Sequence, residues 1–193
     1  MVKKSKKAQH YLKGKKEVSL IVEISVYEGE VYAPYFGKKL DPILGWVKCD
    51  YMKRHEDAFV IFIKVRADNL GNVFISDLKS TSGNAKSEES MASKIEYYSY
   101  ELSAALYLDI FNLMLDDSLE CFVWIFASKD NFNCMCWEST NEVIQVGRAM
   151  WIAAIKKIAD MSDNNWKTVE YVEKIKPTPY QRRWLQQNDA DLL

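Results

Sequence analysis

Two charged residues fall inside the apolar faces of two predicted helices, and such misplaced charges are a natural place to look for chemistry. Asp109 interrupts the apolar run YLDIFNLMLDD, at the centre of the stripe that residues 88–115 would bury as a helix. Arg148 falls within the stripe of a second predicted helix, 140–161. Burial could tune Asp109 as a catalytic acid. An isolated buried carboxylate needs a partner, however, so we favour a structural ion pair between Asp109 and Arg148.

A second set of acidic residues lies on or beside predicted strands, namely Asp68, Asp77, Glu170 and Glu173. A metal-dependent nuclease or hydrolase uses clustered carboxylates, commonly with a lysine nearby. No spacing among these four acids is distinctive, and acids on a solvated sheet face explain them equally well. A metal-dependent nuclease or hydrolase is therefore the second alternative function.

Cysteine, histidine and glycine patterns argue against several other kinds of site. Cys134 and Cys136 could form half of a zinc site with Cys49 or Cys121, but C-x-C on a strand more often means two buried free thiols. Neither of the two histidines lies where a catalytic base would be oriented, and the seven glycines form no phosphate-binding motif. We therefore predict no catalytic residue, no metal and no cofactor, and favour a protein that is not an enzyme.

Basic and aromatic residues interleave near both ends of the chain and after the first predicted hairpin. In proteins that bind single-stranded nucleic acid, cations contact the phosphates while rings stack on bases, at about 1–3 kcal/mol per base. The leading hypothesis is an accessory protein that binds nucleic acid, more often single-stranded than not. The predicted contacts are Lys3, Lys4, Lys6, Lys7, Lys13, Lys15, Lys16, Tyr35, Lys38, Lys39, Arg182, Arg183 and Trp184.

Charge is unevenly distributed along the 193 residues. Residues 1–16 hold seven lysines and no acid, which leaves 19 of the 26 basic residues against 27 acidic ones, a net charge of −8, in the remainder. A basic arm on an acidic body is typical of a tail that contacts a polyanion, although a solvated tail has the same composition. The first alternative function follows from the acidic body. It is a protein-interaction factor, an inhibitor or assembly subunit, that binds a basic partner protein.

The order of predicted elements indicates an α+β fold, with a largely antiparallel sheet of about 6–8 strands packed against the two helices. Strands are predicted over 17–27, 30–36, 44–51, 57–67, 72–79, 119–128, 133–139 and 168–175, from period-two alternation and turn residues. Ser139 is expected to cap the second helix. We divide the chain into a basic arm (1–16), one α+β domain (17–176) and a C-terminal tail or short helix (177–193).

The remaining expectations concern location and assembly. No run of about 18 apolar residues occurs, so no membrane contact is predicted. The positively charged start lacks the apolar segment of a signal peptide, and the four cysteines are too few for a disulfide scaffold. A cytoplasmic protein with reduced thiols is expected. Tyr107, Phe111 and Met114 are expected opposite the main stripe of the first helix, where they could form the face of a homodimer.

Overall fold

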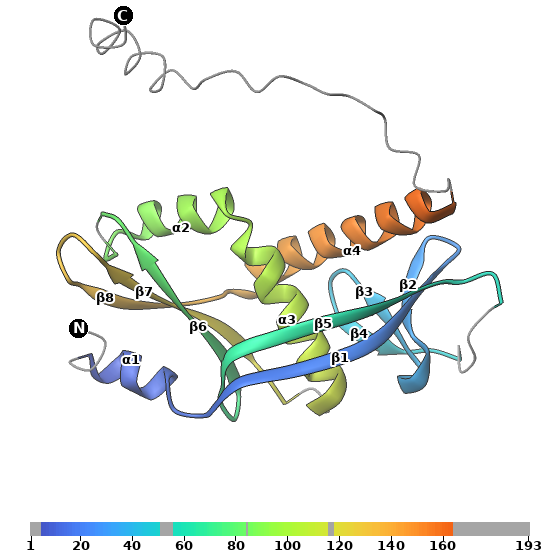
Figure 1. The fold of residues 1–193 in the computed structure, drawn as a ribbon, viewed down its shortest axis with the longest axis horizontal. Helices are drawn as coiled ribbons and strands as arrows, with labels where there is room; N and C mark the ends of the chain where they lie inside the picture. The colour runs from blue at the N-terminus through green and yellow to red at the C-terminus, as the bar shows by residue number, and fades with distance from the viewer. Residues whose placement is uncertain (1–4, 51–55, 84, 116–117, 164–193) are drawn as a thin grey trace, which may run out of the picture.

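The computed structural model describes residues 5–50, 56–83, 85–115 and 118–163, which form one eight-stranded sheet with helices on both faces (Figure 1). The strand order is β4-β3-β2-β1-β5-β6-β7-β8, and every neighbouring pair except β6–β7 is antiparallel. The predicted α+β class is confirmed. The strands are β1 (Lys15–Tyr27), β2 (Glu30–Ala33), β3 (Lys38–Asp41), β4 (Gly45–Lys48), β5 (Phe59–Leu70), β6 (Phe74–Thr81), β7 (Cys121–Ser128) and β8 (Cys134–Glu138).

The two long strands β1 and β5 form the centre of the sheet, paired from Lys15–Leu70 to Val26–Phe59. Val22 and Ile24 of β1 are buried, while Ser19 and Ile21 between the apolar positions are exposed. This is the alternation that the sequence predicts for a half-covered strand. The predicted turn after β1 is also present, with Glu28 and Gly29 both at positive φ, which matches the twist of a tight hairpin.

Strands β5 and β6 are paired only briefly. Their register joins Asn69 to Ser76 and Leu70 to Ile75, and beyond these pairs the two strands diverge (Figure 1). From there β6 runs parallel to β7 over its whole length, from Phe74–Cys121 to Thr81–Ser128. A parallel neighbour requires a long crossover, and α2 and α3 provide it. We call the place where β5 and β6 separate, next to the Asn69–Ser76 pair, the notch.

The first predicted helix is two helices, α2 (Glu88–Tyr97) and α3 (Tyr100–Leu115), because Ser99 lies in the left-handed region at φ +51°. Two expectations for a continuous helix are wrong. Tyr98, placed in the buried stripe, follows the end of α2 at this break and is 58 % exposed. Phe111, placed on an exposed dimer face, is buried together with Asp109 and Leu113 of the predicted stripe, because α3 is buried on opposite faces. Met114 of that face is exposed.

The second long helix, α4 (Asn141–Asp163), packs beside α3 over the sheet. Its first turn is capped by Thr140, whose Oγ1 accepts a hydrogen bond from the Val143 amide. Ser139, the cap expected from the sequence, instead accepts a hydrogen bond from the Phe122 amide, one strand away. The main core lies between these helices and the sheet, and it includes Trp124, Trp151, Phe111 and Phe122.

The N-terminal residues fold onto the opposite face of the sheet as helix α1 (Lys6–Tyr11). Ala8 is completely buried with Phe74, Val123 and Ile125, whereas the alternate residues of β7 face the main core. The first strand begins at Lys15, so the lysine-rich segment is partly helix and partly strand over its described length. The predicted strand 168–175 and the tail 177–193 lie outside the described residues. Among the described residues, no helix is long and apolar enough to cross a membrane.

Candidate functional site

Two aspartates and a lysine meet in the notch between β5 and β6. Continuing the observed register by one pair places Asp68 of β5 opposite Asp77 of β6, and their carboxyl groups are in hydrogen-bond contact. Lys79 lies two residues beyond Asp77, on the same face of β6. Its Nζ is 2.5 Å from Asp77 Oδ2. The side chain of Asp77 is 18 % exposed and that of Lys79 is 30 % exposed, while Asp68 is exposed, so the group is open to solvent on one side.

The environment makes proton binding by Asp77 unusually favourable. Burial raises the pKa of Asp77 to about 6, the hydrogen bond with Asp68 adds to the rise, and the contact with Lys79 opposes it. Two carboxylates so close repel each other when both are ionised. The same Asp77 contact helps to raise the pKa of Lys79 against the effect of its own burial, so the lysine is cationic at neutral pH. The arrangement is a closely paired diacid with one fixed cation beside it.

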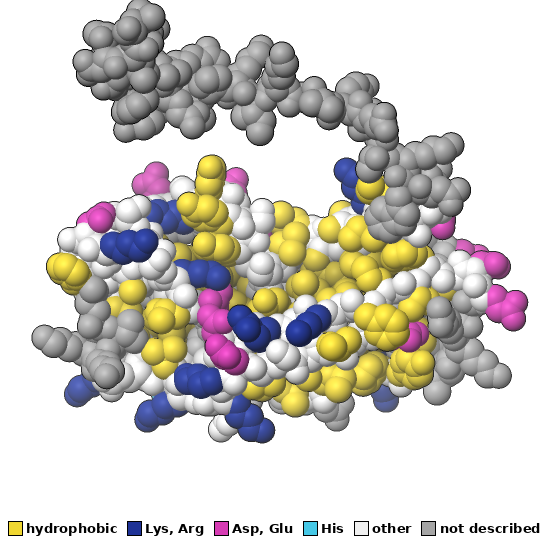
Figure 2. All heavy atoms as spheres, viewed as in Figure 1, with side chains coloured by type: hydrophobic (Ala, Val, Ile, Leu, Met, Phe, Trp, Pro, Cys, Tyr) yellow, Lys and Arg dark blue, Asp and Glu magenta, His cyan; other side chains and the backbone are white. Residues whose placement is uncertain are grey.

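Aromatic and basic side chains surround the pair. Lys79 Nζ lies 4.8 Å from the centre of the Tyr100 ring, within the range of a cation–π contact. Lys64 and Arg66 are exposed and alternate with buried residues along β5, which puts them on the same face as Asp68. Figure 2 shows acidic side chains gathered over the junction of β5 and β6, with lysine and arginine side chains on both sides. A polyanion could therefore approach the diacid between cations.

The donor set of the notch fits magnesium or manganese better than zinc. No three histidine, cysteine or acidic side chains converge on a common point in the described ranges. Mg²⁺ does not need such a cage, since it usually keeps several waters and binds one or two carboxylates together with the phosphates of a substrate. Asp68 and Asp77 supply those two hard oxygen donors. A divalent cation between them would also offset the repulsion that raises the pKa of Asp77.

The lysines predicted to bind nucleic acid near the N-terminus lie on and after α1. Lys6, Lys7 and Lys13 are exposed. Lys16, at the start of β1, instead donates hydrogen bonds to the Leu12 carbonyl and, at 2.6 Å, to Asn69 Oδ1. Lys15 is exposed on the same strand. This segment is attached to the β6–β8 half of the sheet.

The other predicted contacts lie at the opposite half of the sheet or outside the described residues. Tyr35, which is 77 % exposed, lies in the segment that joins β2 to β3. Lys38 is the first residue of β3. Lys39 is bound to Glu30, at 2.9 Å. The structure thus does not bring Tyr35, Lys38 and Lys39 together with the N-terminal lysines (Figure 1). Lys3, Lys4, Arg182, Arg183 and Trp184 lie outside the described residues.

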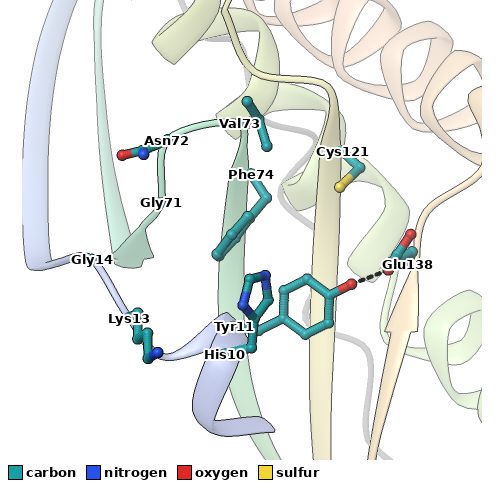
Figure 3. Close-up of a pocket in the computed structure, with 10 residues that line it drawn as sticks. All are labelled: His10, Tyr11, Lys13, Gly14, Gly71, Asn72, Val73, Phe74, Cys121 and Glu138. Atoms are coloured by element: carbon teal, nitrogen blue, oxygen red, sulfur yellow. Dashed lines mark hydrogen bonds between the residues drawn. The ribbon is translucent and has the colours of Figure 1, made fainter. Parts of the chain in front are cut away.

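A hollow of about 600 Å³ lies between α1 and the turn that joins β5 to β6 (Figure 3). The rings of His10, Tyr11 and Phe74 gather there, and the Tyr11 hydroxyl donates a hydrogen bond to Glu138 Oε1. This hydrogen bond and burial raise the pKa of Tyr11 to about 12. The contact ties α1 to the end of β8, which is a structural role.

The cysteines on this side of the sheet are free thiols. Burial raises the pKa of Cys136 to about 11, and the neighbouring Cys134 adds to the rise. Burial likewise raises the pKa of Cys121 and Cys134. No third histidine, cysteine or acidic side chain converges on Cys134 and Cys136 in the described residues, so within them the geometry offers no support for a C-x-C zinc site.

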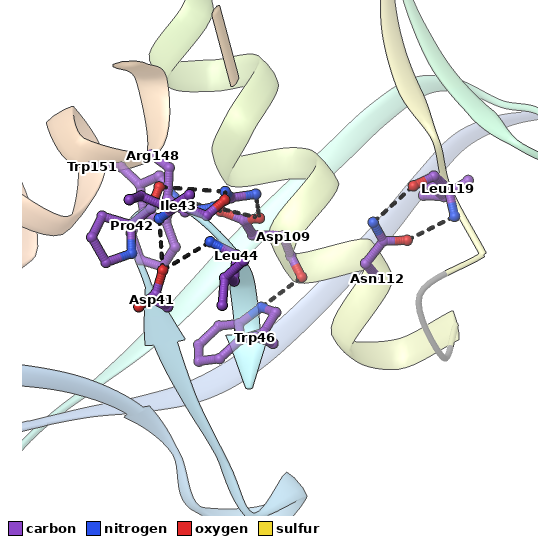
Figure 4. Close-up of polar contacts among 10 residues, drawn as sticks. All are labelled: Asp41, Pro42, Ile43, Leu44, Trp46, Asp109, Asn112, Leu119, Arg148 and Trp151. Carbon is purple, nitrogen blue, oxygen red and sulfur yellow. Dashed lines mark hydrogen bonds and ion pairs between the residues drawn. The ribbon is translucent and has the colours of Figure 1, made fainter. Parts of the chain in front are cut away.

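Asp109 and Arg148 meet in the core between α3 and α4 (Figure 4). Arg148 donates to the carboxylate through both Nη2, at 2.7 Å from Oδ1, and Nε, at 2.9 Å from Oδ2. Trp151 Nε1 donates to Oδ2 at 3.0 Å, and Trp46 Nε1 donates to the Asp109 carbonyl at 2.8 Å. Arg148 Nη1 also donates to the Ile43 carbonyl. Asp109 is 3 % exposed and Arg148 is 8 % exposed, so the carboxylate and its ion-pair partner are enclosed in the core. The Asp109 carboxylate therefore has a structural role.

Comparison with known proteins gives a relationship of fold. No family model matches the sequence, and no curated protein is similar to it in sequence. The crystal structure of a protein from Eubacterium rectale, described as a "Putative exonuclease", superposes with a TM-score of 0.54 at 14 % identity. The match covers 94 % of this chain and 61 % of that chain, so the present chain spans under two thirds of that protein's length. At this identity the likeness shows that the two share a fold.

The sequence groups Asp68 and Asp77 only as two of four acids that could converge, and it does not single out Lys79. One signal was present: Asp77 and Lys79 are two residues apart on a predicted strand, and a period of two puts both on one face. The predicted hairpin of residues 57–67 and 72–79 also places Asp68 at its turn and Asp77 on the strand that follows. Only the register of β5 and β6 shows that the two carboxyl groups are in contact. Glu170 and Glu173 lie outside the described residues.

Proposed function

We propose that this protein is a divalent-metal-dependent nuclease whose reaction takes place at Asp68, Asp77 and Lys79. The observation that carries the proposal is the contact of two carboxyl groups with each other and with a lysine in a half-buried, solvent-open notch. Structural acids are normally exposed or paired with cations, as Asp109 is, whereas two acids in mutual contact destabilise the fold when both are charged. Such an arrangement is typical of a site that binds a cation.

Each of the three residues has a distinct task in this proposal. Asp68 and Asp77 would hold a hydrated Mg²⁺ or Mn²⁺ through their carboxylate oxygens. The metal ion would polarise a phosphoryl oxygen and lower the pKa of a bound water. Lys79, kept cationic by Asp77, lies where it can stabilise the negative charge that develops on the phosphate during attack. Its contact with Tyr100 limits the freedom of its ammonium group.

Two further observations support a nucleic acid as the substrate. The exposed cations Lys64 and Arg66 line the approach to Asp68, and phosphate neutralisation by such residues is the main source of affinity for nucleic acid. The Eubacterium rectale protein of the same fold is described as a "Putative exonuclease". Neither observation distinguishes DNA from RNA.

A cleavage assay on the full chain tests the proposal. Labelled single- and double-stranded DNA and RNA are incubated with Mg²⁺, Mn²⁺ or EDTA, and products are separated on a denaturing gel. We expect cleavage that requires the metal and falls at least about a hundredfold in Asp77→Asn and in Lys79→Ala. Asp57→Asn removes an exposed acid from the other end of the same hairpin and should cleave like wild type. Equal cleavage by all these variants would indicate a contaminating nuclease and defeat the proposal.

A second candidate function keeps the same ligand without the chemistry. The protein would bind nucleic acid as a non-enzymatic accessory factor, supported by the exposed Lys6, Lys7 and Lys13 on and after α1. The assay separates the two functions, because an accessory factor would bind the same oligonucleotides and leave them intact in Mg²⁺ and Mn²⁺.

A further inference from the structure

A second hollow, of about 340 Å³, adjoins the notch at the far end of β6. Its walls come from three places in the sequence: the end of β6, the link between α2 and α3, and the turn after β7. Tyr100, which contacts Lys79, is part of both this hollow and the notch. The lining residues are Ser80, Thr81, Ser82, Lys94, Tyr98, Tyr100, Phe126 and Lys129.

Two lysines supply positive charge to this hollow. Lys94 Nζ, half-buried, donates to Thr81 Oγ1 at 2.5 Å and to the Ser82 carbonyl, both of which are neutral acceptors. The Lys129 amide donates a hydrogen bond to the Thr81 carbonyl, which holds the Lys129 backbone at the same end of β6. In the described part of the chain neither ammonium group forms an ion pair with a carboxylate. An anion entering the hollow would meet uncompensated charge and the hydroxyls of neighbouring serines.

An aromatic platform borders the same hollow. The Tyr98 ring stacks on the Tyr100 ring, with centroids 5.3 Å apart and planes 21° apart, yet Tyr98 as a whole is 58 % exposed. Tyr97 packs edge-on against Tyr98 at 4.9 Å. The left-handed Ser99 between them, at φ +51°, turns the chain so that Tyr98 and Tyr100 face each other. A ring that is held in place and exposed is suited to stacking on a planar ligand.

We propose that this hollow binds one nucleotide of a single-stranded nucleic acid, with its phosphate between Lys94 and Lys129 and its base on Tyr98. This inference rests on the proposed nuclease function, because it extends the same strand from the notch. Lys79 and Thr81 are two residues apart on one face of β6, roughly 7 Å by the rise of a strand, which is on the scale of one step of a nucleic-acid backbone. A base within a duplex has no free face to offer Tyr98, so the nucleotide must be unpaired.

The competing explanation is that Lys94 is only a tether between α2 and the end of β6. Its two hydrogen bonds to β6 and the following turn would fit that role, and removing it could lower stability. The decisive variants are therefore Lys129→Ala and Tyr98→Leu, since Lys129 and Tyr98 are exposed. Lys157→Ala, at an exposed position of α4, is the control for lost charge, and Phe132→Leu, in the turn after β7 and outside the lining of the hollow, is the control for a lost exposed aromatic ring.

The experiment measures fluorescence anisotropy of a labelled oligothymidylate with the full-length variants in EDTA, at two salt concentrations, after thermal unfolding shows that each is folded. We expect Tyr98→Leu to weaken binding about fivefold or more. We expect Lys129→Ala to weaken it mainly at low salt and to lower the slope of log affinity against log salt by about one. Binding by both variants equal to that of Lys157→Ala and Phe132→Leu would overturn the inference.

Cleavage by the same variants separates this inference from the proposed function. If wild type cleaves and the Tyr98 and Lys129 variants match it in KM and in affinity, the nuclease function stands and the subsite does not exist. If wild type never cleaves but Tyr98→Leu still binds the oligonucleotide less tightly than Phe132→Leu does, the subsite stands and the nuclease function fails. A rise in KM at nearly constant kcat supports both.

Discussion

At the scale of single residues, Asp109 and Asp77 differ in how their negative charge is compensated. Asp109 receives hydrogen bonds from Arg148 and Trp151, and the Arg148 guanidinium compensates its negative charge. Asp77 shares its site with another carboxyl group, and only Lys79 offsets their repulsion. The sequence draws attention to Asp109 because the residue interrupts an apolar run, but the carboxylate that shares a single cation with a second acid is Asp77.

Replacing Asp77 with asparagine should stabilise the protein at neutral pH. The pKa of Asp77 is raised from 3.8 to about 6 by burial and by Asp68, so the folded state holds a proton that the unfolded state releases between these two values. Stability is therefore lost as pH rises through this window, by up to about 3 kcal/mol. Asp77→Asn removes that loss, and the opposing effect of Lys79 is already included in the pKa of about 6. Urea unfolding at pH 7.5 should show the gain, and at pH 4 the gain should disappear. A variant less stable than wild type at both pH values would contradict this account.

Metal binding should depend on pH through the same group. A carboxylate must release its proton to bind a metal ion, so the affinity for Mn²⁺ should be nearly constant above about pH 7 and fall toward tenfold per pH unit well below 6. Isothermal titration at pH 5, 6 and 7.5 measures this directly. Asp57→Asn should titrate like wild type, and Asp77→Asn should show weak binding with little pH dependence. A flat profile for wild type would mean that the metal binds elsewhere.

The Asp109–Arg148 pair should show strong coupling in a double-mutant cycle. Asp109→Asn and Arg148→Met each leave a buried partner uncompensated, at a cost of about 3–5 kcal/mol. Together they should cost less than the sum by at least about 1 kcal/mol, because neither charge is then left alone. Urea unfolding of the four proteins gives the coupling free energy. Additive losses would show that each residue acts through its other contacts, such as Trp151 or the Ile43 carbonyl.

At the scale of elements, local patterns predicted most strands, and long-range pairing decided the rest. The alternation in β1 and the turn at Glu28–Gly29 are local, and both are present. The short strand β3 was missed, because its four residues Lys38–Asp41 depend on pairing with β2 and β4. The helix break was missed because Ser99, a non-glycine residue at positive φ, carries no sequence signal for a left-handed conformation. The candidate site depends on the β5–β6 register, which no local pattern shows.

The close crossing of α3 and α4 depends on the absence of a side chain at Gly147. A Cβ there would lie 2.0 Å from the Glu101 carbonyl oxygen and 3.0 Å from the Ala105 Cβ. On an exposed helix, glycine to alanine would stabilise by about 1 kcal/mol. Here the two helices would have to separate, so we expect Gly147→Ala to destabilise by about 1–3 kcal/mol. Ala154→Gly, on the exposed face of α4, is the inverse control and should cost about 1 kcal/mol in urea unfolding. Equal or greater stability of Gly147→Ala would refute the close contact.

At the scale of the whole molecule, the sheet separates the cations that the sequence suggested would act together. The N-terminal lysines lie at the β6–β8 half, and Tyr35, Lys38 and Lys39 lie at the β2–β4 half. Between them, Lys64 and Arg66 of β5 lie on the same face as Asp68. A nucleic acid that follows the central strands toward the notch would contact this middle group first.

A nucleic-acid strand that follows β5 into the notch and one that lies on α1 would differ in the salt dependence of binding. Each lost phosphate contact lowers the slope of log affinity against log salt by about one. If the strand follows β5 into the notch, Lys64→Gln with Arg66→Gln should lower the slope by about two, and Lys6→Gln with Lys7→Gln should leave it nearly unchanged. Both pairs are exposed, remove the same charge and leave Ala8 and Tyr11 in place, so long-range attraction falls equally in the two variants. Anisotropy with a labelled single strand between about 50 and 200 mM salt spans the range in which such slopes are measured. A loss confined to the Lys6 and Lys7 variant would place the strand on α1 and leave the notch without its substrate.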